Sequence, residues 1–292
     1  MNTSDCSVCF KQILLRTMKA FDAFCSQHQL VYMAAYGTVI GAVRHQGLIP
    51  WDDDIDVFMD WDNYQRFLSL KDEAEKTGYS IIDRKNTGYY LPIAKFADQH
   101  TTIWENKYLP FVFGVYIDIF PLGYVQNVSA SRKLRELYLK HSLLLTRAYT
   151  RFSWTKQDIL FAIKHPMDFM DYLIQRKKRE VHQKELDVLD GIIADIREGD
   201  YRLYYRSMDD FEQSLFKAQW FEKTLRVPFE DFEISIPAGY HEYLTTAYGD
   251  YMTPPPVEKQ ISNHPHYYLN LKEGLSLKEV KKRVESGEKL VF

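Results

Sequence analysis

The N-terminal part of the chain carries a helical pattern of apolar positions. Over residues 8–28 the apolar side chains fall at spacings of three and four, at Leu14, Met18, Phe21 and Cys25. Residues so spaced share one face of a helix, so the stretch predicts an amphipathic α-helix. The pattern then changes to a continuous apolar run, LVYMAAY at 30–36, which predicts a strand that Gly37 ends.

The next segments have the character of strands. Residues 54–59 (DIDVFM) alternate acidic and apolar side chains, which predicts a strand with two distinct faces. Residues 79–84 and 89–98 flank a turn at 86–88 and predict a hairpin. Residues 115–120 (VYIDIF) predict a further strand, which Pro121 ends.

The second half of the chain is different. Between Ser129 and Ser214 strand signals are scarce, and helical patterns rich in Leu, Lys, Arg and Glu take over; strand-like residues return at 226–236. We therefore predict an α+β fold with a mixed sheet core. Its expected parts are a catalytic core at 1–125, a helical insertion at 126–225 that faces the acceptor or a membrane, and a C-terminal segment at 226–292 that completes the core.

Composition and charge narrow the function classes. The 292 residues include 37 Lys and Arg against 40 Asp and Glu, and the net charge of −3 gives no basic footprint for nucleic acid. The most apolar run, at 109–125, is interrupted by Gly114, Asp118 and Pro121 and is typical of a strand and turn rather than a membrane span. The chain opens without an apolar segment behind a basic start, which favours a cytoplasmic protein.

An acidic run set among apolar residues is the strongest chemical signal. Asp52, Asp53, Asp54 and Asp56 lie between Trp51 and VFM at 57–59. On a strand, Asp54 and Asp56 would point to one face, and carboxylates brought together in this way suit a hard cation such as Mg²⁺ or Mn²⁺. Asp118, a lone acid on the strand at 115–120, is the candidate third carboxylate. The alternative is a solvated acidic loop without a metal.

A second signal precedes the acids. The segment TVIGAVRHQG predicts a short helix ending at Gly47, so Gly37 and Thr38 would present N–H groups and a hydroxyl at a helix N-terminus. Such an arrangement suits a phosphate group. Gly-Thr alone is a common pair, but its place about sixteen residues ahead of an acid–apolar–acid strand is more specific.

These motifs together resemble those of the LicD family, which includes the fukutin-related proteins, in the nucleotidyltransferase superfamily. The resemblance rests on YGTVIGAVRHQGLIPWDDDIDVFM (36–59), GVYIDIFPLG (114–123) and YGDYMTPPP (248–256) with a later His. It implies a nucleotidyltransferase-like fold, a divalent cation, and transfer of a phospho-alcohol from a CDP-alcohol donor to a glycan. The group implied for bacterial members is often phosphocholine, and the acceptor is a cell-surface or lipid-linked glycan or teichoic acid.

The resemblance also implies roles for residues. Asp54, Asp56 and Asp118 would hold the metal, and Asp118 is alternatively the general base for the acceptor hydroxyl. Gly37 and Thr38 would bind donor phosphate, with His264 from the tail. Asp52 and Asp53 would orient the loop around the metal.

Three basic residues are further candidates for binding the donor phosphate. Arg44 and His45 follow the Gly-Thr turn, and their alternative role is to interact with the dipole at the end of a helix. Lys95 interrupts an apolar strand, and its alternative role is to protect a sheet edge. Tyr89, Tyr90, Trp104 and Tyr116 are near the predicted site in sequence and are candidates for the aromatic box that choline would need.

Two other interpretations remain open. One is a nucleotidyltransferase that moves a nucleoside monophosphate onto a small molecule or protein. The other is a non-catalytic glycan- or nucleotide-binding protein.

Residues 154–180 combine apolar side chains with the basic cluster 176–179, which suits a helix in a membrane interface; the alternative is a helical subdomain packed on the core.

Overall fold

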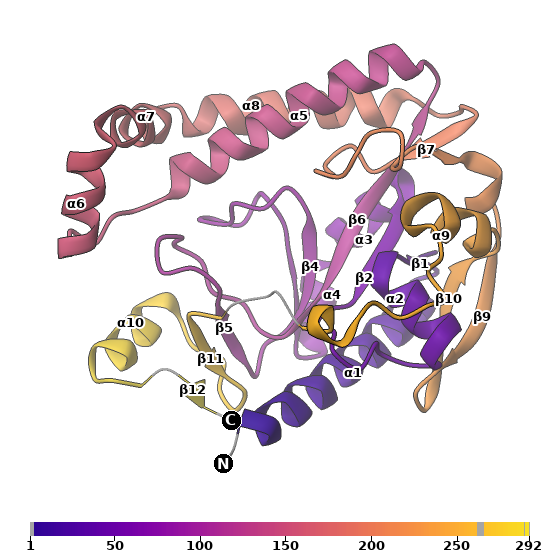
Figure 1. Ribbon diagram of the computed structural model, residues 1–292, viewed down its shortest axis with the longest axis horizontal. Helices are drawn as coiled ribbons and strands as arrows, with labels where there is room; N and C mark the ends of the chain where they lie inside the picture. The colour runs from indigo at the N-terminus through magenta and orange to yellow at the C-terminus, as the bar shows by residue number, and fades with distance from the viewer. Residues whose placement is uncertain (1–2, 262–265, 289, 292) are drawn as a thin grey trace.

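The computed structural model describes residues 3–261, 266–288 and 290–291, and its centre is a mixed sheet (Figure 1). The strands follow the order β1-β2-β6-β4-β3, and β7 and β8 extend the far end of β6. Their bounds are Met33–Ala34 (β1), Asp56–Asp60 (β2), Tyr116–Val125 (β6), Ala94–Asp98 (β4), Tyr79–Ile82 (β3), Tyr201–Leu203 (β7) and Phe216–Lys217 (β8). Of these pairs, β2 and β6 run parallel and the others antiparallel.

The predicted N-terminal helix is confirmed. Helix α1 spans Thr3–Gln27 and packs against β4 and β6. Leu14, Met18, Phe21 and Cys25 are all buried, so the apolar stripe read from the sequence is the face that covers the sheet. Helix α3, Trp61–Ser69, follows β2 directly, with Asp60 as its N-cap.

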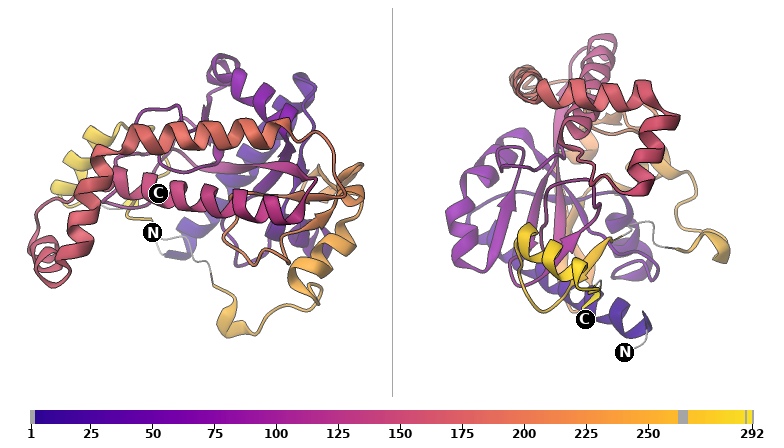
Figure 2. Two further views of the ribbon diagram at one scale, coloured as in Figure 1. Left: turned by 90° about the horizontal axis from the view of Figure 1, so that it is seen from above. Right: turned by 90° about the vertical axis from the view of Figure 1, so that its left-hand side faces the viewer.

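A layer of long helices covers another side of the sheet (Figures 1 and 2). It consists of α5 (Val128–Tyr149), α6 (Lys156–Lys164), α7 (Pro166–Lys177) and α8 (Arg179–Asp195). A second apolar core, which includes Tyr138, Leu145, Leu186 and Leu189, joins α5 and α8 to the sheet side. None of the helices that the structure describes has both the length and the apolar character needed to cross a bilayer.

The remaining elements complete the core and the C-terminal segment. They are the short helices α2 (Tyr36–Ile40), a π-helix (Gly41–His45) and α4 (Lys71–Lys76), the hairpin β9 (Thr224–Phe229) and β10 (Phe232–Pro237), helix α9 (Tyr240–Tyr248), and a small sheet of β5 (Thr102–Trp104), β11 (Tyr268–Asn270) and β12 (Leu290–Val291) beside α10 (Leu277–Glu285). Short 3₁₀ turns lie at Ala218–Phe221 and Val257–Lys259. The predicted α+β class and the strands at 226–236 are confirmed.

Three sequence predictions differ from the structure. The helices of the predicted insertion end at Asp195, and residues 201–217 of the same range add strands to the sheet. The strand at 30–36 is only two residues long, because helix α2 begins at Tyr36, before Gly37. The strand β2 begins at Asp56, so Asp54 lies in the loop that leads into it rather than on the strand.

The strand predicted at 115–120 also runs further than expected. Pro121 does not end it, and β6 continues to Val125. The Asp118 N–H donates to Ile55 on the β2 side of β6. N–H groups alternate along a strand, so position 121 faces away from β2. On that side β4 pairs only as far as Ile119 and β7 begins at Gly123. Proline therefore occupies a gap where no ladder hydrogen bond is lost.

Candidate functional site

The parallel pairing of β2 and β6 places two carboxylates side by side. Asp56 lies opposite Asp118 in the register of the two strands, and their neighbours Val57 and Ile119 are also opposite each other. Paired residues project from the same face of a sheet, so both aspartates leave the sheet together. Val57 and Ile119 are fully buried on the other face. The alternation that the sequence predicted is therefore what separates the acidic site from the core.

The negative charges of the aspartates at this site repel one another. The pKa of Asp56 is well above its ordinary value because the carboxyl is shielded from water and because Asp54, Asp118 and Asp52 repel its charge. Lys95 opposes this shift. Several like charges at one place are costly unless a positive group joins them, so the arrangement favours a cation.

The buried positive group is Lys95 on β4. Its Nζ donates to Asp118 Oδ1 at 2.7 Å, and the side chain is 1% exposed. The ammonium lies 3.3 Å from the ring centroid of Tyr116 and 5.0 Å from that of Phe113. The structure therefore gives Lys95 a contact that the sequence did not reveal, as the counter-charge of Asp118. Its binding of donor phosphate stays a prediction.

Helix α2 contacts the start of β2. The Thr38 hydroxyl accepts a hydrogen bond from the Asp56 N–H at 2.8 Å and is buried, so Thr38 fixes the point where the acidic strand begins. The Gly37 backbone lies against Asp52, since a Cβ at Gly37 would come within 2.9 Å of the Asp52 Oδ2 atom. Gly-Thr and the acidic run are thus neighbours in space, as their spacing suggested.

The loop before β2 gathers the remaining acids. Asp52, Asp53 and Asp54 each offer a carboxylate oxygen, and these oxygens lie within 4.8 Å of one another. Among the described residues, these three aspartates are the group of potential metal ligands found at such short distances from one another. Oxygen donors alone are the ligand set that Mg²⁺ and Mn²⁺ prefer, so Asp52, Asp53 and Asp54 have the chemistry of a divalent-cation site, whereas the other two predicted ligands, Asp56 and Asp118, do not belong to this close group.

A cleft of about 430 Å³ opens beside these acids. Residues from five parts of the chain line it: Tyr36, Gly37, Asp52, Asp54, Asp56, Phe120, Tyr204, Arg206, Ser207, Met208, Asp209 and Tyr248. The sequence interpretation missed the contribution of residues 204–209 and of Tyr248. Residues 204–209 lie far from the acids along the chain, and the aromatic run RLYY at 202–205 was the one local signal of a strand returning to the core.

Of the predicted phosphate ligands that the structure describes, Gly37 lines this cleft, whereas Thr38, Lys95, Arg44 and His45 do not, and neither does the predicted metal ligand Asp118. The Arg44 Nη1 atom donates to the Tyr251 carbonyl at 2.6 Å, and its Nε atom donates to His45 Nε2 at 2.9 Å. Burial and the neighbouring Arg44 lower the pKa of His45. In the structure Arg44 ties the C-terminal segment to the π-helix, a contact that neither of the two predicted roles included. His264 lies outside the described residues.

The candidate aromatic box read from the sequence is interior packing. Tyr89, Tyr90, Trp104 and Tyr116 are all buried, and the Tyr90 and Tyr116 hydroxyls donate to Glu105. Other rings line the cleft instead. Phe120 is 4.8 Å from Tyr204 and 5.9 Å from Tyr36, measured between ring centroids, and Tyr248 is half exposed at the same cleft.

Arg206 is a buried cation at the wall of the cleft. Its Nη2 atom donates to Asp190 Oδ1 at 2.9 Å, and the same oxygen accepts from the Tyr138 hydroxyl at 2.9 Å. Burial acts to lower the pKa of Arg206, but Tyr138 and Asp190 together raise it well above its ordinary value. The residue therefore stays charged, held by helices α5 and α8.

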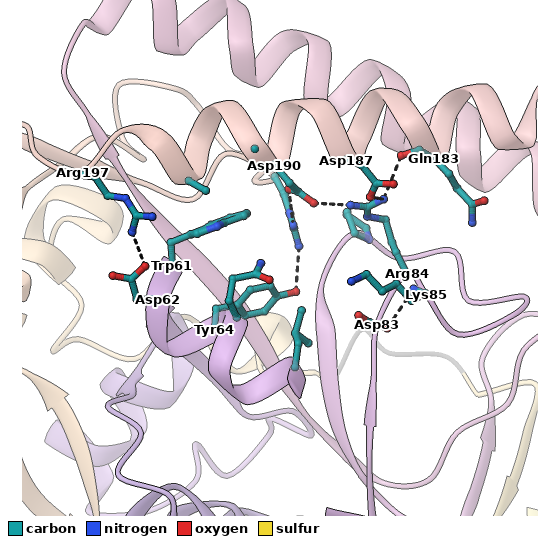
Figure 3. A pocket seen from close by; sticks show the side chains of 16 residues that line it. Trp61, Asp62, Tyr64, Asp83, Arg84, Lys85, Gln183, Asp187, Asp190 and Arg197 are labelled. Atoms are coloured by element: carbon teal, nitrogen blue, oxygen red, sulfur yellow. Dashed lines mark hydrogen bonds and ion pairs between the residues drawn. The ribbon is translucent and has the colours of Figure 1, made fainter. Parts of the chain in front are cut away.

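On its far side Arg206 borders a second cavity, of about 890 Å³, between α3 and α8 (Figure 3). Figure 3 shows Asp190 and Asp187 projecting from α8 toward Arg84, which forms ion pairs with both. Trp61 and Tyr64 of α3 line the opposite wall. Asp190 thus binds two arginines, and the helical layer determines where Arg206 stands in the acidic cleft.

Comparison with known proteins identifies the class to which this fold and cleft belong. Residues 29–142 match the family model described as "LicD/FKTN/FKRP, nucleotidyltransferase domain", a range that includes Gly37, Thr38 and all the acids from Asp52 to Asp118. The lipopolysaccharide cholinephosphotransferase LicD of Haemophilus influenzae is 30% identical over 261 residues, which cover 86% of this chain and 93% of that protein. The chain therefore belongs to the LicD family, as its motifs predicted.

Two shorter matches involve uncharacterised proteins. One from Rickettsia typhi is 33% identical over 72 residues, and one from Rickettsia prowazekii is 32% identical over 68 residues. Each covers about a quarter of both chains. Because both proteins are uncharacterised, the matches add nothing about activity.

Proposed function

We propose that the protein transfers phosphocholine from a CDP-linked choline donor to a sugar hydroxyl of a lipopolysaccharide-type glycan. The observation that carries the proposal is the pairing of Asp56 with Asp118 beside a cleft that Asp52, Asp54 and Asp56 line, in a chain that is similar over most of its length to a lipopolysaccharide cholinephosphotransferase. In this reaction a sugar oxygen forms a bond to the phosphorus that bears choline. The bond from that phosphorus to the bridging oxygen breaks, and CMP leaves.

The predicted divalent cation, Mg²⁺ or Mn²⁺, would be held by Asp54, Asp56 and Asp118, with Asp52 and Asp53 beside them. When bound, it would neutralise charge on the donor pyrophosphate. Asp118 is also the candidate that receives the proton of the sugar hydroxyl. The Lys95 ammonium donates to this carboxylate at 2.7 Å and so fixes its orientation.

The cleft supports a cationic alcohol in particular. Tyr36, Phe120, Tyr204 and Tyr248 offer ring faces and edges, and Asp209 adds negative charge near them. A quaternary ammonium is attracted to such surfaces through cation–π interactions. Glycerol and ribitol carry no charge and gain no cation–π attraction, so the lining favours choline among the CDP-alcohols.

The donor phosphates need positive partners. Arg206 lines the same cleft and keeps its charge, so we assign it to the developing charge of the pyrophosphate. Gly37 and Thr38 border the acidic loop and remain candidates for the same task. Asp190 is a positioning residue, because it acts through Arg206.

Release of CMP tests the proposal. The purified protein is incubated with CDP-choline, CDP-glycerol or CDP-ribitol and a glycan extract, with Mg²⁺ or with EDTA. The expected result is metal-dependent CMP release from CDP-choline, reduced at least about a hundredfold by Asp56→Asn, the range that loss of electrostatic stabilisation gives in other enzymes. Release from another CDP-alcohol alone would refute the choline assignment. Transfer of the CMP group itself to an acceptor would instead favour the nucleotidyltransferase interpretation. Nucleotide binding without turnover would favour a binding protein.

A further inference from the structure

We propose that the outer face of helices α6 and α7 docks on an anionic lipid surface. The two helices form one end of the helical layer, the end opposite to β7 (Figure 1). Helix α6 begins at a capping box made by Thr155 and Asp158, and helix α7 begins with Pro166. Each helix is therefore well defined locally, and its two faces can be compared.

The inner faces of the two helices are aromatic and already packed. Phe152 lies 5.9 Å from Phe161, 5.2 Å from Phe169 and 5.4 Å from Tyr172, measured between ring centroids. Arg147 of α5 forms an ion pair with Asp171 of α7 at 2.5 Å, which ties the pair of helices to the layer. This small aromatic core explains how α6 and α7 hold together without using their aliphatic residues.

The outer faces are aliphatic and exposed to water. Ile163 is 71% exposed and Met167 is 85% exposed. The exposed apolar residues of the two helices are Ile159, Leu160, Ile163, Met167, Met170, Leu173 and Ile174; Trp154, also exposed, lies before α6 and contacts Phe169. On α6 they stand at positions i, i+1 and i+4, and on α7 at i, i+3, i+6 and i+7, so each helix presents one continuous stripe. A continuous apolar surface of this kind usually marks a contact site.

Basic residues border the same surface. Residues 154–180 contain six Lys or Arg and four Asp or Glu, whereas the whole chain is net negative at −3. Two of the four acids are engaged within the fold, Asp158 at the cap of α6 and Asp171 with Arg147. Lys156, Lys164 and the cluster 176–179 are all exposed.

This combination identifies the occupant as lipid rather than a second copy of the chain. Two copies joined through this face would bring two basic borders together, and like charges at close range oppose association. An anionic bilayer surface accepts both features, because the aliphatic stripe enters the headgroup region while the Lys and Arg side chains meet the lipid phosphates. The inference is independent of the transfer reaction.

Vesicle sedimentation tests the proposal with the full chain. Vesicles of phosphatidylcholine alone are compared with vesicles that also contain phosphatidylglycerol. We expect binding to the anionic vesicles and release of the protein by added NaCl, because the basic residues act electrostatically. Ile163→Glu/Met167→Glu should weaken binding at least tenfold. Lys177→Glu/Lys178→Glu should weaken it by about fivefold or more per charge.

A matched control separates this face from general surface apolarity. Val8→Glu/Val31→Glu changes two other exposed apolar residues, 56% and 49% exposed, and should bind as the parent protein does. Circular dichroism checks that each variant is folded. The proposal is overturned if the parent protein stays in the supernatant with anionic vesicles, or if both outer-face variants bind unchanged. It is also overturned if sedimentation velocity shows a dimer that Ile163→Glu/Met167→Glu dissolves while lipid binding is absent. CMP release in solution is measured separately, so failure of the transfer reaction can be distinguished from failure of lipid binding.

Discussion

Lys95 is the internal counter-charge of the acidic cleft, and replacing it tests why the aspartates are tolerated there. Lys95→Met removes the charge but keeps the length of the side chain against Tyr116 and Phe113. Lys95 is 1% exposed and Asp118 14% exposed, so this is a buried pair. Breaking such a pair from one side costs about 3–5 kcal/mol, because the remaining charge loses its counter-charge. We expect that loss in the free energy of unfolding without divalent cation.

Urea unfolding in EDTA measures this loss in the free energy of unfolding, and two matched variants are measured beside Lys95→Met. Lys95→Arg keeps the charge and should lose less stability. Lys95→Met/Asp118→Asn removes both charges and should recover most of the loss, since neutral groups of similar shape are tolerated where an uncompensated charge is not. The reasoning is refuted if Lys95→Met costs less than about 1 kcal/mol, the size of an exposed ion pair, or if the double variant is no better than the single one.

The same variant should respond to pH and to Mg²⁺. The pKa of Asp56 is already raised and Lys95 opposes the rise, so replacing Lys95 should raise the pKa of the Asp56 carboxyl further. A carboxyl whose pKa is raised in the folded state lowers stability as pH increases from its unfolded pKa, about 4, toward the raised value, so the stability lost in Lys95→Met should shrink toward about pH 4. A cation at the acids would replace the lost charge. At a hundred times its dissociation constant Mg²⁺ should add about 2.7 kcal/mol. An unchanged midpoint with Mg²⁺ for both proteins would argue against the metal site.

Three further predictions concern other parts of the molecule. Asp190→Asn should cost about 3–5 kcal/mol in urea unfolding, because it leaves Arg206 buried with a weaker partner, whereas Asp187→Asn, at a 64% exposed side chain, should cost less than about 1 kcal/mol; equal costs would contradict the buried network. Tyr248→Leu should raise the KM for CDP-choline about fivefold, the value of an exposed cation–π contact, and leave CDP-glycerol unaffected; equal effects on both donors would remove Tyr248 from choline binding. Burial and the neighbouring His141 and Lys178 lower the pKa of His182, so the unfolded state binds more protons below about pH 6.5 and stability should fall there; His182→Leu should abolish that dependence, and a parent protein equally stable at pH 5 and 7 would contradict it.

The parts of the site that the sequence predicted are local. Gly37, Thr38 and the acids from Asp52 to Asp56 lie within one short stretch, and alternation along a strand was enough to separate the acidic face from Val57 in the core. Asp118 could be predicted because a single acid in an apolar strand is costly to bury unless a charged partner or a cation compensates it. The expectation that this strand lies near β2 required only the tendency of such acids to share one face of a sheet.

The parts that the sequence did not predict depend on contacts between distant segments. Nothing near Lys95 in the sequence shows that its ammonium faces Asp118, since that contact is set by the register of β4 against β6. The same holds for Arg206, which lies in the stretch up to Ser214 that the sequence analysis assigned mainly to helices. Its position follows from Asp190, which lies on helix α8 and also binds Arg84. A substitution in the helical layer can therefore change the charge balance of the acidic cleft without touching it, which is why Asp190→Asn tests more than the stability of a helix.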